Sequence, residues 1–232
     1  GAVIGSGADA EASLWLNPQS WAVISGAATG AQADTLMQTV FEGLNTPYGL
    51  QVMAPPYRYG AFDGARMLLF NPGTKENGSV FCQPQGWAIL AEALLGHGER
   101  AFRYFAESSP ASFNDNADLR GIEPYVHSQF IEGADSPYAG RAHVHWLTGT
   151  ASTVMVGCVE GILGLRPTPK GLVISPAIPA AWNGFTMQKI FRGKTLRITV
   201  QNPQHRESGV TRLVLNGIEH APGLILTEEL LA

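Results

Sequence analysis

A short polar stretch, residues 73–83, carries side chains that could bind a charged or hydroxylated ligand. Lys75 and Glu76 stand side by side in it, and Gln83 ends it. Asn77-Gly78 predicts a tight turn, because glycine tolerates a positive φ and the close approach of another group. Exposed turns ahead of a buried helix are frequent positions for binding residues. Taken alone, the pattern favours a solvated surface turn, so any function depends on what lies near it in the fold.

A second polar cluster lies further along the chain, between residues 123 and 152. Thr148-Gly149 opens a long apolar segment with helical spacing. Free backbone N–H groups, a hydroxyl and the positive end of the helix dipole would converge there, which suits a phosphate group. Without other observations, Thr148 is more readily interpreted as a helix N-cap. Tyr125 and Gln129 bring hydrogen-bonding groups that are compatible with a sugar and are also common in loops.

Two histidines in this cluster, His143 and His145, stand two residues apart and raise the question of a metal. No third ligand follows at a spacing typical of zinc sites, so pairing or packing roles are favoured and no metal is predicted. Asn77-Gly78-Ser79 fits a glycosylation sequon, which would have no role in a cytoplasmic chain.

The polar clusters alternate with segments whose apolar residues recur at helical spacing. Asn17-Pro18 predicts a helix start with Asn as N-cap. The last such segment is almost wholly apolar, so a helix buried on most sides is expected. The predicted helices begin at Asn17, cover residues 31–44, begin at Pro84, and cover residues 101–107 and 148–163. Residues 46–80 and 111–145 show no long helical period and are predicted to form long structured loops.

The apolar period changes near Pro167, from about 3.6 residues to about 2. Short β-rich runs separated by turn signals follow at residues 172–174, 185–190, 195–200, 212–215 and 224–227. We therefore expect a mainly α protein with a helical domain over residues 1–166 and a small antiparallel β domain over residues 167–232. Helices joined by long loops fit a toroidal helix barrel in which loops 46–82 and 108–147 line one mouth. The helical portion is too short to close a barrel of six helix pairs, so the C-terminal piece of something larger is expected.

Composition argues against several classes of function. The formal net charge of −4 and the lack of a Lys/Arg run argue against nucleic-acid binding. No apolar stretch approaches the roughly 20 residues needed to span a membrane, and residues 1–6 lack the features of a signal peptide. Cys82 and Cys158 are too few for a disulfide framework, which favours reduced thiols and a cytoplasmic location. The sequence has no initiator Met, so a processed or partial chain is expected.

Several motifs together resemble one enzyme family in their order and spacing. They are Asn17-Pro18-Gln19-Ser20-Trp21-Ala22-Val23, Lys75-Glu76-Asn77-Gly78, Glu123-Pro124-Tyr125-Val126, Trp146-Leu147-Thr148-Gly149, Gly164-Leu165-Arg166-Pro167 and Pro176-Ala177-Ile178-Pro179-Ala180-Ala181-Trp182-Asn183-Gly184-Phe185. On these motifs the chain resembles the inverting β-glucoside phosphorylases (glycosyltransferase 36-like). These include cellobiose, cellobionic acid, cellodextrin and chitobiose phosphorylases, with the cyclic β-1,2-glucan synthases as relatives. The resemblance covers nearly the whole chain.

The resemblance implies the C-terminal part of an (α/α)6-barrel catalytic domain followed by a β-sandwich. It also implies cleavage of a β-1,4-linked glucosyl disaccharide to α-glucose 1-phosphate, with inorganic phosphate as co-substrate and no cofactor. Carried over by position, Lys75 and Glu76 would contact the acceptor sugar and Gln129 would hold the glucosyl unit. Thr148 and Gly149 would bind phosphate, which agrees with the helix-terminus argument. A homodimer is also expected.

The chain departs from the family pattern in two ways. Many members place a phosphate-binding His where this chain has Gln83, whose amide can still donate to a phosphate oxygen but carries no charge. This argues against simple cellobiose specificity, and an acceptor with its own carboxylate, such as cellobionic acid, would pair well with Lys75. The family's general acid, an Asp in an Asp-Trp-Asn-Asp type motif, does not occur in the sequence. It is expected upstream of residue 1, so the chain alone is predicted to be inactive.

Two other functions fit the sequence. An inverting hydrolase of the same barrel type would use water and a second carboxylate as base, for which Glu76 and Glu123 are the candidates. A non-catalytic carbohydrate-binding fragment would fit a chain that lacks the acid. Phosphate dependence of cleavage separates the hydrolase from the phosphorylase, and a search for turnover separates binding from catalysis.

Overall fold

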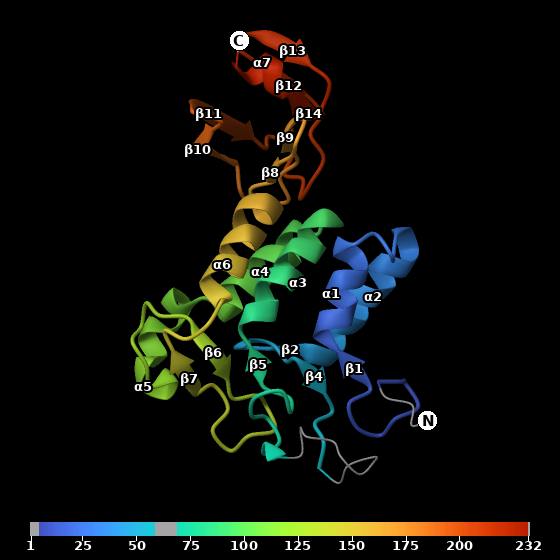
Figure 1. Cartoon of the computed structure of the whole chain (residues 1–232), viewed down its shortest axis with the longest axis vertical. Coiled ribbons are helices and arrows are strands. Elements are labelled where there is room, and N and C mark those ends of the chain that lie inside the picture. Colours follow the sequence, from blue (N-terminus) through green and yellow to red (C-terminus); the bar gives the residue numbers. More distant parts are fainter. Residues whose placement is uncertain (1–4, 59–68, 232) are drawn as a thin grey trace.

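The computed structural model describes residues 5–58 and 69–231, and within them helices and short antiparallel sheets alternate along the chain. Helix α3 lies at the centre of the helical layer and packs against α1, α4 and α6 (Figure 1). The main helices are α1 (Leu16–Ile24), α2 (Gly30–Leu44), α3 (Gln83–Leu94), α4 (Gly98–Ser108) and α6 (Thr150–Val156), which continues as a π-helix, η3 (Gly157–Ile162). In the described part of the chain, no helix is both long enough and apolar enough to cross a membrane.

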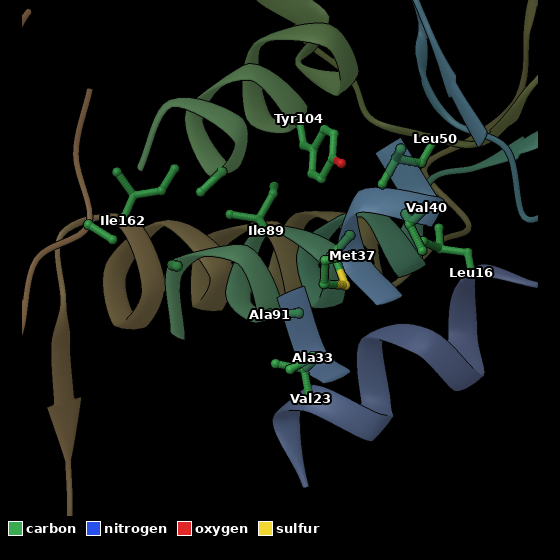
Figure 2. Close-up of a cluster of buried hydrophobic side chains, with 14 of the residues drawn as sticks. Leu16, Val23, Ala33, Met37, Val40, Leu50, Ile89, Ala91, Tyr104 and Ile162 are labelled. Atoms are coloured by element: carbon green, nitrogen blue, oxygen red, sulfur yellow. The ribbon is translucent and has the colours of Figure 1, made fainter. Parts of the chain in front are cut away.

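The hydrophobic core lies between these helices. Apolar residues recur at helical spacing on α2 and α3 and meet in one cluster with residues of α1 and α4 (Figure 2). Leu16, Met37, Leu44, Ile89 and Tyr104 are fully buried in this cluster. Each large apolar side chain removed from water contributes about 1.5–3 kcal/mol to folding. The core therefore fixes the positions of the helices whose ends carry the polar clusters.

Two glycines, Gly86 of α3 and Gly157 at the start of η3, allow α3 to approach the continuous α6–η3 segment to backbone contact. A Cβ built on Gly86 would lie 2.2 Å from the carbonyl carbon of Thr153, and one built on Gly157 would lie 2.7 Å from the carbonyl oxygen of Gly86. A side chain has no room at either position, so only glycine permits this packing. The contact places the first residues of the two helices, Gln83 and Thr150, at the same end of the helical layer (Figure 1).

The predicted helices are present, but three of them differ from the prediction in their bounds or burial. The helix predicted over residues 101–107 is α4, which begins three residues earlier, at Gly98. Asn17 is not an N-cap, because α1 begins at Leu16 and the cap position falls on Trp15, two residues before Asn17. The helix predicted over residues 148–163 begins two residues later than expected, at Thr150. It is also not buried on most sides, since Met155 is 67% exposed. Packing within the described chain therefore covers only part of this apolar helix.

The two long connections are not simple loops, because short strands and helices form inside them. Their strands and the partners of those strands are β1 (Leu14–Trp15) with β4 (Met53–Ala54), β2 (Asn45–Thr46) with β3 (Gly49–Leu50), and the sheet of β5 (Val80–Phe81), β6 (Ser128–Ile131) and β7 (Ala142–His145). The second connection also holds a 3-10 helix, η2 (Pro110–Asn116), and α5 (Ala117–Arg120). Strand β5 ends the first connection and pairs with β6 of the second, so the sheet brings the two connections together.

Antiparallel strands dominate the chain after the π-helix, as the change of period predicts. They are β8 (Leu165–Pro167), β9 (Gly171–Ile174) and β14 (Gly223–Leu226) in one sheet, and the hairpins β10 (Gly184–Phe191) with β11 (Lys194–Gln201) and β12 (Leu213–Leu215) with β13 (Ile218–His220), followed by α7 (Thr227–Leu231). Strands β8 and β13 were not predicted. Arg192-Gly193 and Asn216-Gly217 have a positive φ at both residues, as two-residue hairpin turns require. A second hydrophobic cluster around Leu172 lies among these strands. The division into domains at residue 166 stays a prediction.

Candidate functional site

The sheet β5–β6–β7 places the predicted ligand-binding residues next to one another. Phe81 of β5 pairs with Phe130 of β6. One residue further, the backbone N–H of Cys82 donates to the carbonyl oxygen of Gln129 at 2.8 Å. Gln83 follows immediately as the first residue of α3. Strand pairing therefore places the end of the first polar stretch beside Gln129, and the central helix α3 begins at the next residue.

Lys75 and Gln129 join the two polar clusters. The Lys75 Nζ donates to Gln129 Oε1 and lies 4.7 Å from the ring centroid of Phe130, which is a cation–π geometry. Lys75 has a φ of +50°, so a residue in an uncommon backbone conformation presents the ammonium group. Glu76 is one residue away and open to solvent. The structure thus brings Lys75 and Gln129 into contact and leaves Glu76 on the exposed part of the same turn.

Asn77 fixes the turn that carries Lys75 from the inside. Its side chain is fully buried. The amide oxygen accepts a hydrogen bond from the backbone N–H of Tyr57 at 2.7 Å, and the amide nitrogen donates to the carbonyls of Tyr57 and Phe70, both at 2.9 Å. A buried amide with all these partners specifies one loop conformation. Because its nitrogen is buried and bonded, the folded chain offers no glycosylation acceptor at this sequon.

Gln83, Thr148 and Gly149 come together where α3 and α6 begin. A Cβ added to Gly149 would lie 3.2 Å from Gln83 Nε2, so the Gln83 amide contacts this residue closely. The hydroxyl of Thr153 donates to the backbone carbonyl of Gln83 at 2.8 Å and ties the two helix starts together. Backbone N–H groups in the first turn of a helix lack intrahelical acceptors, so donors gather at this point. Their combination with an amide and a hydroxyl suits an anion.

Thr148 also makes local hydrogen bonds. Its Oγ1 accepts from the backbone N–H of Thr150 at 3.2 Å and lies 2.6 Å from Thr150 Oγ1. The cap position of α6 is Gly149, so the interpretation of Thr148 as N-cap is wrong by one residue. Thr150 Oγ1 donates to the carbonyl of Ser128 at 3.1 Å, and Ser128 precedes Gln129. These bonds join the start of α6 to the strand that carries Gln129.

His143, which is paired with Glu132, packs against the Phe130 ring that the Lys75 ammonium contacts. The His143 ring stacks on Phe130 with 4.9 Å between centroids, and His143 Nε2 lies 2.7 Å from Glu132 Oε1. The other Glu132 oxygen accepts from the Ser136 hydroxyl. The predicted pairing and packing role of His143 is therefore confirmed. Sequence reasoning missed Phe130 and Glu132, because an apolar strand residue and an isolated carboxylate form no motif.

Metal binding finds no support in this arrangement. Among residues 5–58 and 69–231, no group of three or more His, Cys, Asp or Glu side chains is placed to hold an ion. His145 is exposed at the end of β7, and His143 is occupied by its carboxylate partner.

The charge state of the second cluster follows from its hydrogen bonds. Trp146 Nε1 donates to Glu123 Oε1 at 3.2 Å. A hydrogen bond from the residue's own backbone N–H to its carboxylate, followed by the bond from the Trp146 indole, lowers the pKa of Glu123, so the carboxylate is ionised at neutral pH. Burial, followed by the nearby Arg120 guanidinium, lowers the pKa of His127, which is therefore neutral at pH 7. Neither group is poised to act as a general acid at neutral pH.

The fold and the family of the chain follow from comparison with known proteins. A solved structure described as a sialidase is similar with a TM-score of 0.53 and 16% sequence identity, covering 92% of this chain and 20% of that one. At this identity the likeness concerns the fold alone. The sequence profile of the Glycosyl hydrolase 94 superfamily, catalytic domain, matches residues 1–164. The chain belongs to this superfamily.

Curated relatives are similar over nearly the whole chain. N,N'-diacetylchitobiose phosphorylase of Vibrio furnissii is 38% identical over 214 residues, which cover 92% of this chain and 27% of the relative. Solabiose phosphorylase of Paenibacillus borealis is 35% identical over 222 residues, which cover 95% of this chain and 29% of that relative. Cellobionic acid phosphorylase of Neurospora crassa is 34% identical over 209 residues, which cover 88% of this chain and 26% of that relative. The resemblance found in the motifs is confirmed, and the chain spans little more than a quarter of the length of these relatives.

Proposed function

We propose that this chain provides the phosphate- and sugar-binding part of an inverting disaccharide phosphorylase. The observation that carries the proposal is the convergence of two polar clusters at the sheet β5–β6–β7 and the starts of α3 and α6. Lys75 contacts Gln129 there, and Gln83 contacts Gly149. The names of the relatives describe phosphorylases of several disaccharides, which supports the same reaction class for this chain.

The proposed reaction explains why a donor-rich anion site is needed. A phosphate oxygen attacks the anomeric carbon C1 from the face opposite the glycosidic bond, and the C1–O bond to the acceptor breaks. A general acid protonates the departing oxygen, which leaves as the acceptor hydroxyl, and α-glucose 1-phosphate is formed. Phosphate replaces the base-activated water of an inverting hydrolase, so the protein must hold it beside C1.

Each predicted site residue receives one role in this proposal. Gln83 Nε2, the Thr148 hydroxyl and the Gly149 N–H donate to phosphate. Gln129 holds the glucosyl unit and Lys75 contacts the acceptor; the hydrogen bond between the two side chains supports neighbouring glucosyl and acceptor subsites. Glu76, exposed on the same turn, contacts the acceptor. The residues of this role assignment are Lys75, Glu76, Gln83, Gln129, Thr148 and Gly149.

The general acid is proposed to come from outside the 232 residues. The sequence holds no Asp-Trp-Asn-Asp type motif, and the chain spans 27% of the Vibrio furnissii relative. Residues 1–166 would then be the C-terminal part of an (α/α)6 barrel and residues 167–232 a β-sandwich, in a homodimeric cytoplasmic enzyme. The exposure of Met155 supports the barrel, because further helices would cover this side of α6.

The acceptor is proposed to carry a carboxylate, as in cellobionic acid, with cellobiose as the alternative. The Lys75 ammonium offers a cation beside the proposed acceptor subsite, and an ion pair there would favour an acidic sugar. Comparing phosphorolysis of the two disaccharides by an enzyme that contains this chain tests the idea. We expect cellobionic acid to be preferred and Lys75→Met to remove the preference; equal rates, or faster cleavage of cellobiose, would exclude it.

Phosphate binding is tested directly by ³¹P NMR on the 232-residue chain. We expect phosphate to bind, and Gln83→Ala and Thr148→Val each to weaken binding about tenfold, the scale of one hydrogen bond to a charged group. Gln32→Ala, at an exposed position of α2, is the matched control and should change nothing. Failure of the wild-type chain to bind phosphate would overturn the proposal.

Turnover separates the phosphorylase from its alternatives. The isolated chain should release no glucose 1-phosphate, because it lacks the acid. In an enzyme that contains both parts, cleavage should require phosphate. Cleavage without phosphate would instead favour a hydrolase with Glu76 or Glu123 as base, and binding without any turnover would favour a carbohydrate-binding role.

A further inference from the structure

Two aromatic side chains beside the proposed site are unusually exposed. Tyr125 is 73% exposed and Trp146 is 66% exposed. Large aromatic side chains gain most of their stabilising free energy from burial, so a pair of them in solvent indicates a surface that a ligand or another part of the enzyme covers. The proposed roles of the site residues use neither ring.

The two rings are held in a fixed arrangement. Their centroids lie 6.4 Å apart with the planes at 69°, an edge-to-face geometry. The indole N–H of Trp146 donates to Glu123 Oε1 at 3.2 Å. Trp146 has a φ of +66°, a conformation that is uncommon for a bulky residue and persists only where surrounding contacts impose it. The exposed rings are therefore preorganised and do not belong to a freely moving loop.

The rings lie at the end of the sheet that carries the sugar site. His145, which precedes Trp146, pairs with Ser128, and Tyr125 is three residues before Ser128. Gln129 follows Ser128 directly. Thr148 is two residues after Trp146, so their Cα atoms are at most about 7 Å apart. The pair thus lies beside both the proposed sugar and the proposed phosphate residues.

We propose that Tyr125 and Trp146 form a stacking surface for a pyranose ring of the carbohydrate ligand, with Glu123 as the residue that positions the indole. The carbohydrate class of the ligand rests on the proposed function. A pyranose presents an apolar C–H face, which fits an aromatic ring, while its hydroxyls remain available to the polar tips of Tyr and Trp. The ionised Glu123 carboxylate disfavours the anionic alternatives, nucleic acid and acidic lipid.

Fluorescence titration of the 232-residue chain with cellotetraose tests the inference. We expect cellotetraose to quench the tryptophan emission, whereas sorbitol, which has hydroxyls but no ring face, should not. Trp146→Ala should remove the quenching and weaken binding measured by calorimetry about tenfold, the scale of one aromatic contact. Trp146→Phe should restore most of the affinity.

Two matched variants separate ring stacking from general apolar contact. Trp21 belongs to another edge-to-face pair, with Trp87 at 5.6 Å, and Trp21→Ala should leave sugar binding unchanged. Leu147 is 74% exposed next to Trp146, and Leu147→Ala should also have no effect. If Leu147→Ala weakens binding as much as Trp146→Ala, the patch is a general apolar surface and the inference is wrong.

The role of Glu123 has its own readout. Glu123→Gln keeps an oxygen acceptor for the indole and should retain most of the affinity, whereas Glu123→Ala should lower it toward that of Trp146→Ala. Equal affinities of wild type, Trp146→Ala and Tyr125→Ala would overturn the stacking surface. Phosphate binding, measured in parallel, would still report on the proposed function, so failure of one conclusion is distinguishable from failure of the other.

Discussion

Replacing Gly86 by Ala tests whether backbone contact between α3 and α6 builds the site. The added Cβ would lie 2.2 Å from the carbonyl carbon and 2.3 Å from the carbonyl oxygen of Thr153, and 2.6 Å from the backbone nitrogen of Val154. All three obstacles are backbone atoms, so no side-chain rotation relieves the clash. Overpacking of this kind costs about 1–3 kcal/mol, and we expect the upper end. The better helix propensity of Ala returns about 1 kcal/mol, which leaves a net loss of about 2 kcal/mol.

Urea denaturation followed by circular dichroism measures this loss. With a slope of about 2 kcal/mol per molar urea, a loss of about 2 kcal/mol lowers the midpoint by about 1 M. The two helix starts must also separate, so the Gln83 amide moves away from Gly149 and phosphate binding should weaken. Both effects should appear in the same variant.

Gly43→Ala in α2 is the matched control. There the added Cβ meets only Cδ2 of Leu14, at 2.6 Å, and this flexible side chain can move aside. We expect an unchanged or slightly higher midpoint, because Ala favours the helix. A Gly86→Ala variant with the wild-type midpoint, or one no less stable than Gly43→Ala, would refute the packing argument.

Three further outcomes are expected. Asn77→Ala should lower the stability of the chain by about 2–4 kcal/mol in urea denaturation and expose the turn to proteases, because three backbone groups, two of them on buried Tyr57, lose their hydrogen bonds; wild-type stability would contradict the buried network. Burial raises the pKa of Cys82 and Cys158 from 9.0 to about 11 each, so both thiols should react slowly with a thiol reagent at pH 8 until the chain is unfolded. Because the pKa of each thiol is higher in the folded chain than in the unfolded chain, the contribution of the thiol to the free energy of unfolding is fully present below pH 9 and should be lost as the pH rises toward 11. Rapid reaction of the thiols in the native chain would contradict the burial. Gln83→His should make phosphate bind more tightly as the pH falls through about 6.5, where imidazole gains a proton; a pH-independent gain in ³¹P NMR titrations would mean that residue 83 does not face the phosphate.

Much of the secondary structure is predictable because its causes are local. Apolar spacing predicts α2 and α3, and residues such as Asn216-Gly217 predict a turn whose positive φ values the structure bears out. The short strands inside the two connections escape prediction, because two-residue strands such as β5 carry too few residues to show a period. The cap of α1 also escapes prediction: Asn17 is a favourable cap residue, but the cap position lies two residues earlier, at Trp15.

Some features of the candidate site can likewise be predicted from the sequence, and others depend on the tertiary structure. Sequence alone identifies the two polar clusters, the family and the unusual Gln83, since residue types and motif spacing are properties of the chain itself. Only the tertiary structure decides that Lys75 meets Gln129, 54 residues away, and that Gln83 lies against Gly149. These meetings depend on strand pairing between β5 and β6 and on the backbone contact at Gly86, and no local preference encodes either one. The exposure of Tyr125 and Trp146 is likewise a tertiary result, because burial is decided by what packs against a side chain and not by its type.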